Sequence, residues 1–203
     1  MISYTESVAQ YVKERIIEMS KINYEPKIRA TLAKLRRGVG KHPGEIPEIW
    51  EITLMKTYEK LQLPEILLPR AEFAIHVALC LFACHQQGKD IATECMHQSD
   101  KPDDKQKKYL LGKAVRRLLT DNNDNNKSII RRFNVLATSS DIEEFAYHLR
   151  GMVQLLKAKS IPLDYYQLTK DIYEFMEPER RNQIRLRWGL DFYGGSKQDN
   201  IET

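Results

Sequence analysis

The sequence predicts an all-α protein made of two small helical bundles in series. Apolar residues recur at spacings of three and four along most of the chain, which is the period that gives a helix one buried face. The nine glycines and eight prolines are few and scattered, as is typical of helical rather than sheet proteins. No stretch has a credible β-strand pattern, and the apolar fraction of 42% is enough for a core.

Residues 1–105 are expected to form an N-terminal bundle. Its helices are predicted at roughly 8–21, 26–37, 45–61 and 70–87. The last of these is the most apolar and should be the central buried helix. Pro26 suits the first position of its helix, Gly38 is placed to end that helix in a left-handed conformation, and Trp50 should help to fix it on the bundle. The polar segment 88–106 indicates a linker or a long exposed loop, with a domain boundary near residue 105.

Residues 106–195 are expected to form a C-terminal bundle. Its helices are predicted at roughly 107–119, 127–137, 141–159, 163–176 and 179–193. Ser139 or Ser140 should cap the third of them, because Ser140 is followed three residues later by Glu143, the spacing of a capping box. The polar residues 196–203 should form a disordered tail.

The positive charge lies in two local blocks, although the net charge of +4 is small. Between Lys27 and Lys41 there are six Lys/Arg residues and no acid, and between Lys105 and Arg132 there are nine against two Asp. A helix that buries one face and presents an unneutralised basic row on the next is a candidate surface for a polyanion. The first block taken alone slightly favours the simpler alternative of an ordinary solvated basic face.

The candidate phosphate ligands are mostly arginines, whose planar fork can grip a phosphate with two hydrogen bonds. They are Arg29, Arg36, Arg37, Lys113, Arg116, Arg117, Arg131, Arg132, Arg150, Arg185 and Arg187. Few aromatic residues are interleaved with them, so a base-stacking platform is not expected. The pattern instead favours contacts along a nucleic-acid backbone without reading of sequence.

The most apolar helix also carries the best candidates for a metal site. They are His76, Cys80 and Cys84 at four-residue spacing, with His85, Cys95 and His97 nearby. Side chains at i and i+4 can share a metal, but buried cysteines usually pack as small apolar groups and no C-x-x-C is present. We therefore expect core packing, with neither a metal nor a cofactor.

No catalytic motif is present: there is no G-x-S-x-G, no phosphate-binding glycine-rich loop and no H-E-x-x-H. We therefore expect no enzymatic activity, and a metal-dependent helical enzyme built on the His76–His97 cluster is the least favoured alternative. Three cysteines, two of them in an apolar helix, fit a reducing cytoplasm. The longest apolar stretch, Ala74–Cys84, is too short to span a bilayer, and the N-terminal residues lack a signal-peptide pattern.

Several motifs resemble, in order and spacing, those of a known family. They are Leu35-Arg36-Arg37-Gly38 followed by a Pro-rich turn and Trp50, Leu111–Leu119, Arg131-Arg132-Phe133, His148–Lys157, Leu163–Tyr166 and Arg185–Tyr193. The ordered set is similar to the small subunit of the type I-E CRISPR Cascade surveillance complex, the CasB family. The resemblance covers nearly the whole chain.

The resemblance implies an all-helical, non-enzymatic subunit present as two copies, head to tail. It implies contacts with the large subunit and with the backbone subunits that carry the guide RNA, and stabilisation of the R-loop by binding of the displaced non-target DNA strand, with contact to crRNA or target DNA as a further possibility. It places on the DNA-binding surface Arg36, Arg37, Lys113, Arg131, Arg132 and Arg150. The chain departs from compact members in its longer segment 88–106, its Asn-rich loop 121–126 and in Gly151, which stands where a second basic residue can occur.

The alternative to this role is a free-standing helical nucleic-acid-binding regulatory protein. Such a protein would bind a particular duplex sequence tightly as the isolated chain. The sequence leaves open whether the two basic blocks form one continuous face.

Overall fold

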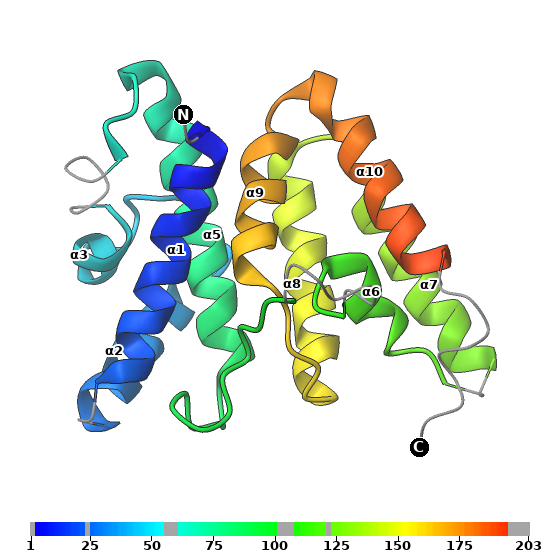
Figure 1. Cartoon of the computed structure of the whole chain (residues 1–203), viewed down its shortest axis with the longest axis horizontal. Helices are drawn as coiled ribbons and strands as arrows, with labels where there is room; N and C mark the ends of the chain where they lie inside the picture. Colours follow the sequence, from blue (N-terminus) through cyan, green and yellow to red (C-terminus); the bar gives the residue numbers. More distant parts are fainter. Residues whose placement is uncertain (1–2, 23–24, 55–60, 101–107, 121–122, 195–203) are drawn as a thin grey trace.

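A computed structural model describes residues 3–22, 25–54, 61–100, 108–120 and 123–194 (Figure 1). The described part of the chain is all-α, as predicted, and its only β-type pairing is an isolated bridge between His97 and Leu163. The helices are α1 (Tyr4–Lys21), α2 (Glu25–Arg37), α3 (Trp50–Thr53), α5 (Leu68–His85), α6 (Leu111–Arg116), α7 (Asn123–Ala137), α8 (Ile142–Ala158), α9 (Tyr165–Phe175) and α10 (Pro178–Tyr193), with 3-10 turns η1 (Pro47–Ile49) and η2 (Glu65–Leu67). The predicted tail 196–203 lies outside the described residues.

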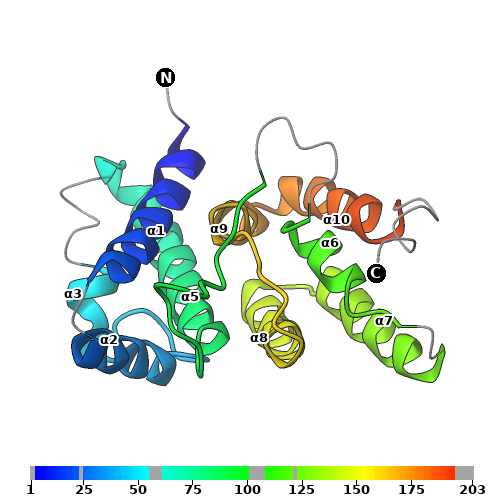
Figure 2. The same ribbon diagram turned by 60° about the horizontal axis from the view of Figure 1, so that its bottom comes forward.

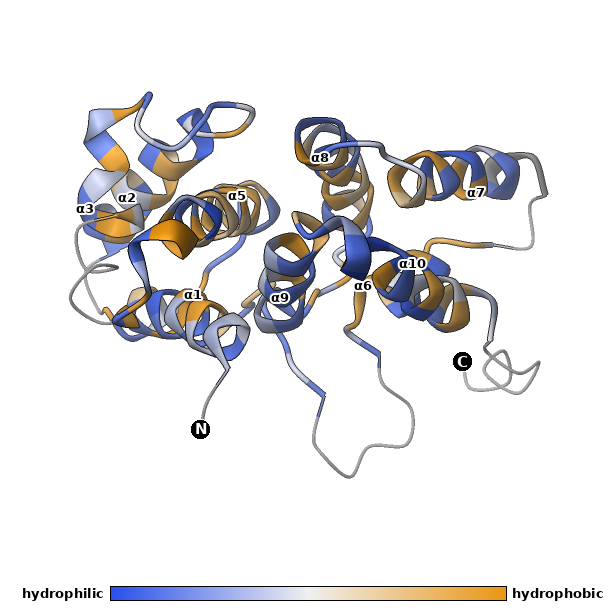
Figure 3. Cartoon of the chain, turned by 90° about the horizontal axis from the view of Figure 1, so that it is seen from above, coloured by the Kyte–Doolittle hydropathy of each residue, from blue (hydrophilic) through white to orange (hydrophobic). Residues whose placement is uncertain are grey.

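Helix α5 occupies the centre of the arrangement, as its apolar sequence predicts. It packs against α1 and α2 from its own half of the chain and against α8 and α9 from the other half. Seen from two directions, α1, α9 and α10 lie along one side of the molecule and α2, α8 and α7 along the other (Figures 2 and 3). Helix α6 packs on α10.

Helices from both halves of the chain share one continuous cluster of buried side chains. Among the described helices, α1 and α9 make the most extensive pairing. Phe82 of α5 meets Tyr165 of α9 edge to face, with ring centroids 5.3 Å apart. The division into two bundles near residue 105 stays a prediction, and the two predicted halves are in close contact over α1, α5, α8 and α9.

The described part of the predicted linker, residues 88–100, contains no helix and is mostly exposed, but two of its side chains anchor it to the core. Met96 and Ile91 are buried in it. The Gln86 amide holds the segment from α5, because its Oε1 accepts from the Met96 N–H at 2.9 Å and its Nε2 donates to the Glu94 carbonyl at 3.0 Å. The Leu163 N–H donates to the Met96 carbonyl at 3.0 Å. Hydrogen bonds from one buried amide and from the backbone of Leu163 therefore fix a segment whose composition is that of a linker.

Helix α2 ends at Gly38, as predicted, but the expected left-handed conformation is wrong. Gly38 is not among the positive-φ glycines, which are Gly40, Gly44 and Gly88 in the described chain. It is required for close approach, because a Cβ there would lie 2.6 Å from Cys80 Sγ and 2.9 Å from Ile49 Cδ1. The absence of a side chain at Gly38 therefore lets the end of α2 lie directly on α5.

Two further local predictions are corrected. Trp50 is 40% exposed and is not an anchor, while its neighbour Ile49 is 1% exposed and fills the space beside Gly38. Helix α8 is capped by Asp141 rather than by Ser139 or Ser140, since the Asp141 carboxylate accepts from the Glu144 N–H at 2.8 Å. The carboxylate of Asp141 accepts a hydrogen bond from a free backbone N–H in the first turn of the helix at least as well as a serine hydroxyl would.

By length and composition the helical run Glu65–His85 could cross a bilayer, contrary to the prediction that no stretch is long enough. Most of it is buried within the protein. All residues from Ala74 to Ala83 are buried, against α1, α2, α8 and α9. This burial is typical of the core helix of a globular fold, which passes the same test of length and hydropathy.

Candidate nucleic-acid interface

Helix α2 buries Ile28, Leu32 and Leu35, leaves Arg36 half-buried and exposes its other basic residues. The exposed Arg29 pairs with Glu25 one turn earlier. The exposed Arg37 pairs with Glu48, with Nη1 and Oε2 2.8 Å apart. Exposed pairs of this kind contribute little to stability, about 0–1 kcal/mol, so either guanidinium can exchange its carboxylate for another anion at small cost.

Arg36, also on α2, differs from these two because it has no ion pair or hydrogen bond to any side chain in the described chain. Arg150 on α8 likewise has no ion pair or hydrogen bond to a side chain in the described chain, and it is exposed. Helix α8 buries Phe145, Leu149, Met152, Val153 and Leu156, so Arg150 and Lys157, which are two turns apart, lie away from the core. The Lys157 Nζ donates to Gln87 Oε1 at 2.8 Å.

The charges of one basic residue of α2 and two of α8 act on Cys84, near the C-terminal end of α5. Burial raises the pKa of the Cys84 thiol, and the positive charges of Arg150, Arg36 and Lys157 act in the opposite direction. Three cations from two helices are therefore close enough to one thiol to affect its ionisation. We call Arg36, Arg150 and Lys157 the Cys84 cluster.

The second basic block lies mainly on α7. Arg131 and Arg132 are exposed, beside the buried Phe133, and no carboxylate in the described chain pairs with them. Arg132 lines a shallow groove of about 260 Å³ between α7 and the end of α8, together with Lys159. We call Arg131 and Arg132 the α7 pair.

Helices α2, α8 and α7 lie along the same side of the molecule, with α8 in the middle (Figures 2 and 3). Near the C-terminal end of α8, Lys157 belongs to the Cys84 cluster and Lys159 lines the groove of Arg132. The last turns of α8 thus connect the Cys84 cluster with the α7 pair. Sequence reasoning missed both lysines, although their place outside the apolar stripe of α8 was a usable signal.

The basic residues of α6 have mixed surroundings. Arg117 is exposed and Lys113 is half-buried, and neither is paired within the described residues. Arg116 instead donates from Nη1 to the Phe192 carbonyl at 2.9 Å and so ties α6 to α10.

Arg185 and Arg187 on α10 are held by partners inside the protein. Arg185 donates from Nη2 to the Ser139 carbonyl at 2.7 Å, and Arg187 donates from Nη2 to Asp171 Oδ1 at 2.6 Å. Burial raises the pKa of Asp171 to about 6, although the Arg187 charge and a 2.6 Å hydrogen bond from the Trp188 indole N–H both lower it. A DNA contact for these two arginines stays a prediction. In the structure, their hydrogen bonds connect α10 to Ser139 and to Asp171 of α9.

The candidate metal ligands of α5 lie in the core. The His76 Nε2–H donates to the Gly38 carbonyl at 3.0 Å, and Cys80 packs against Gly38. Burial lowers the pKa of His76 and raises that of the Cys80 thiol. No group of three possible metal-binding side chains occurs in the part of the chain that the structure describes.

The family model for CRISPR-associated protein Cse2 matches residues 31–193 of this chain. The chain belongs to the Cse2 family. The prediction drawn from the ordered motifs, a member of the CasB family of Cascade subunits, is thereby confirmed. A Cse2-family protein is a subunit of a CRISPR Cascade complex, which disfavours the alternative of a free-standing regulator.

Solved structures of this family have the same fold. The structure of CasB from Thermobifida fusca is 31% identical, with a TM-score of 0.73 over 95% of this chain and 99% of that one. CasB from Thermus thermophilus (20% identity, TM-score 0.65, 96% and 100% of the two chains) and M. ruber CasB (21%, 0.62, 100% and 100%) are similar in fold. None of the curated proteins matches this chain.

Proposed function

We propose that this chain is a non-catalytic structural subunit that stabilises the R-loop by binding the backbone of the displaced non-target DNA strand. The observation that carries the proposal is that Arg36 on α2 and Arg150 on α8 are both unpaired within the described chain, while the charge of each acts to lower the pKa of the same thiol, Cys84. Neither guanidinium has to give up a carboxylate in order to bind a phosphate. Arg37, the α7 pair, Lys113 and Arg117 extend this surface.

The energetics of R-loop formation suit such a surface. Forming the heteroduplex is nearly balanced against loss of the DNA duplex, so contacts with strand backbones can tip the equilibrium. Phosphate contacts do not depend on the base sequence. For single-stranded DNA, the loss of one phosphate contact makes binding less sensitive to salt, and the slope of log K against log salt falls by about 0.7. A subunit that serves every guide sequence needs this kind of contact.

The proposed partners follow from the same role. They are the large subunit, the backbone subunits that carry the guide RNA, a second copy of this chain, the single-stranded non-target DNA and, at its margins, crRNA or target DNA. We place the assembly in the cytoplasm, where its nucleic acids are.

The test uses the whole complex reconstituted with Arg36→Ala/Arg150→Ala. R-loop lifetime on a matched duplex should fall by about tenfold or more, since a hydrogen bond to a charged group contributes about 1.5–3 kcal/mol. The slope of log affinity against log salt should fall by about 1.4. The lifetime is measured by single-molecule or filter-binding decay at several salt concentrations.

The matched control is Lys170→Ala/Arg180→Ala, which removes the same charge from two cations of α9 and α10 that are paired with acids and are not candidate phosphate ligands. It should leave the lifetime close to that of the unmodified complex. Equal lifetimes and equal salt slopes for the Arg36/Arg150 variant and the unmodified complex would refute the proposed function.

A further inference from the structure

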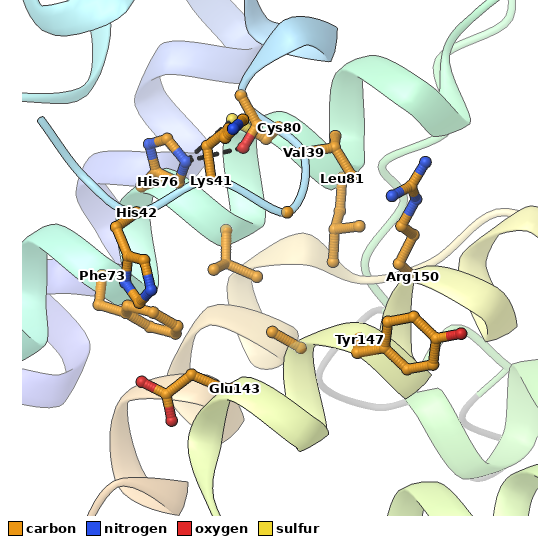
Figure 4. A pocket seen from close by; sticks show the side chains of 14 residues that line it. Val39, Lys41, His42, Phe73, His76, Cys80, Leu81, Glu143, Tyr147 and Arg150 are labelled. Atoms are coloured by element: carbon orange, nitrogen blue, oxygen red, sulfur yellow. Dashed lines mark hydrogen bonds between the residues drawn. The ribbon is translucent and has the colours of Figure 1, made fainter. Parts of the chain in front are cut away.

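A pocket of about 210 Å³ opens beside the Cys84 cluster, between the loop that follows α2, the middle of α5 and the first half of α8 (Figure 4). Its walls carry three aromatic side chains, Phe73, His42 and Tyr147. Val77 and Leu81 of α5 add apolar surface. The volume is smaller than the roughly 300–1,000 Å³ of pockets for drug-sized ligands, so the occupant is about one ring system in size.

Tyr147 is the unusual side chain of this pocket. It is 72% exposed, among the most exposed large apolar groups of the described chain. It lies three residues before Arg150 on α8, and both side chains reach the rim of the pocket (Figure 4). Exposed aromatic residues beside arginine are typical of binding surfaces rather than of solvated faces.

The loop after α2 is shaped to leave the space beside Arg150 open. Gly40 adopts a φ of +78°, which favours glycine. A Cβ at Gly40 would be 3.6 Å from Arg150 Nη1, so the loop backbone passes close to the guanidinium with no side chain between them. The Arg150 guanidinium therefore belongs both to the rim of the pocket and to the Cys84 cluster.

The opposite end of the pocket carries a carboxylate. Glu143 of α8 lies near Phe73 and His42 (Figure 4), and the described chain offers it no ion pair or hydrogen bond. The His42 and Phe73 rings are tilted by 53° with centroids 6.4 Å apart. A carboxylate repels phosphate, so a nucleic-acid backbone would pass at the Arg150 end and leave the Glu143 end to a group that donates hydrogen bonds.

We propose that this pocket takes one unpaired nucleobase of the bound DNA strand. The base stacks on Tyr147, the adjoining phosphate binds Arg150, and the backbone continues to Arg36 and Lys157. Glu143 accepts a hydrogen bond from an exocyclic amino group, as carboxylates do from cytosine N4. This proposal rests on the proposed function. It adds that the subunit binds one nucleotide of the DNA strand through its base, while it binds the rest of the strand through the backbone.

The experiment uses the whole complex and a matched duplex in which 2-aminopurine replaces successive bases of the non-target strand. At one position the fluorescence should be quenched relative to its neighbours, because the base stacks on Tyr147. Tyr147→Phe keeps the ring and should keep the quenching, whereas Tyr147→Ala should lose it. The alanine variant should also shorten the R-loop lifetime by roughly five- to a hundredfold, the range expected for one base–aromatic stack.

An abasic site at the quenched position supplies the second measurement. Because it removes the stack on Tyr147 together with the contact to Glu143, it should shorten the lifetime in the unmodified complex and have a much smaller further effect in Tyr147→Ala. Cytosine at this position should be preferred over thymine, and Glu143→Gln should reduce that preference.

The outcomes separate the two proposals. If the Arg36/Arg150 variant loses R-loop lifetime but no position depends on Tyr147, the nucleobase pocket is wrong and the proposed function stands. If Tyr147→Ala instead releases the subunit from the complex before DNA is added, the pocket binds a protein partner and the proposal is overturned. If neither variant changes the lifetime, both proposals fail.

Discussion

Arginines on the α2–α8 face and arginines on α10 have the same chemistry but different surroundings. Arg36 and Arg150 are unpaired within the described residues, whereas Arg185 and Arg187 are bound to a carbonyl and to a buried carboxylate. The difference comes from what the neighbouring elements present. The end of α7 and helix α9 bring oxygens to α10, while α5 brings a thiol and apolar side chains to the α2–α8 face. A basic residue is most available to a ligand where the fold leaves its donors unpaired or paired only with an exposed carboxylate.

The largest expected effect that sharpens this comparison is on stability. Arg187→Ala should lower the free energy of unfolding by about 2 kcal/mol, because it leaves the Asp171 carboxylate buried with only Trp188 and Gln167 as donors. The expected loss of stability is smaller than the roughly 3–5 kcal/mol for breaking a fully buried ion pair, because the Arg187 side chain is 39% exposed.

Urea unfolding of the purified chain measures this effect. Arg150→Ala is the matched control and should stay within about 0.5 kcal/mol of the parent protein. Equal stabilities of the Arg187 and Arg150 variants would remove the distinction between the two regions.

The next effect concerns DNA. Arg131→Ala/Arg132→Ala should weaken binding of the complex to double-stranded target by up to about tenfold, with a shallower salt dependence, because two exposed and unpaired cations are lost. The unfolding curve of the chain should not move, since neither side chain contributes to the core. Target affinity at two salt concentrations is the measurement. An unchanged affinity would exclude the α7 pair from the surface.

The smallest effect is expected at Gly151. A Cβ there meets nothing within 4 Å, and the residue lies in the interior of α8. Gly151→Ala should therefore stabilise the protein by about 0.5–1 kcal/mol without changing DNA binding. Thermal unfolding measures the stability, and Gly38→Ala, which places a Cβ 2.6 Å from Cys80 Sγ, should shift it in the opposite direction. A destabilised Gly151→Ala variant would show that α8 is more constrained than its contacts indicate.

Helix positions and the family could be predicted because both depend on local patterns. The apolar period placed the core helices, and the ordered motifs indicated the CasB family. Gly38 shows where such reasoning ends, since a glycine after a basic helix is ordinarily a left-handed cap. Its close approach to Cys80 depends on a helix 30 residues further along the chain. Gln86 is a similar case, because its two anchoring hydrogen bonds cannot be seen in a hydropathy pattern.

The candidate site was predicted in part. The role of the basic residues as DNA ligands stays a prediction, and sequence could not distinguish Arg150 from Arg187, because Arg187 is paired with a carboxylate of another helix. Tyr147 was missed since only the packing of α8 shows that it is exposed. The expectation that the chain has no base-stacking platform stays a prediction, and the proposed role of Tyr147 is its test.

The bare backbone at Gly38 has a consequence for how variation in this chain should be interpreted. Gly38 immediately follows Arg37 and sets how closely α2 approaches α5, and α5 also supports α8. A side chain at this position would move Arg36 relative to Arg150 without changing the number of charged residues in the protein. Two homologues with identical basic residues could then differ in their affinity for the proposed DNA strand. The spacing of the charges depends on the residue at this position, whereas their number does not.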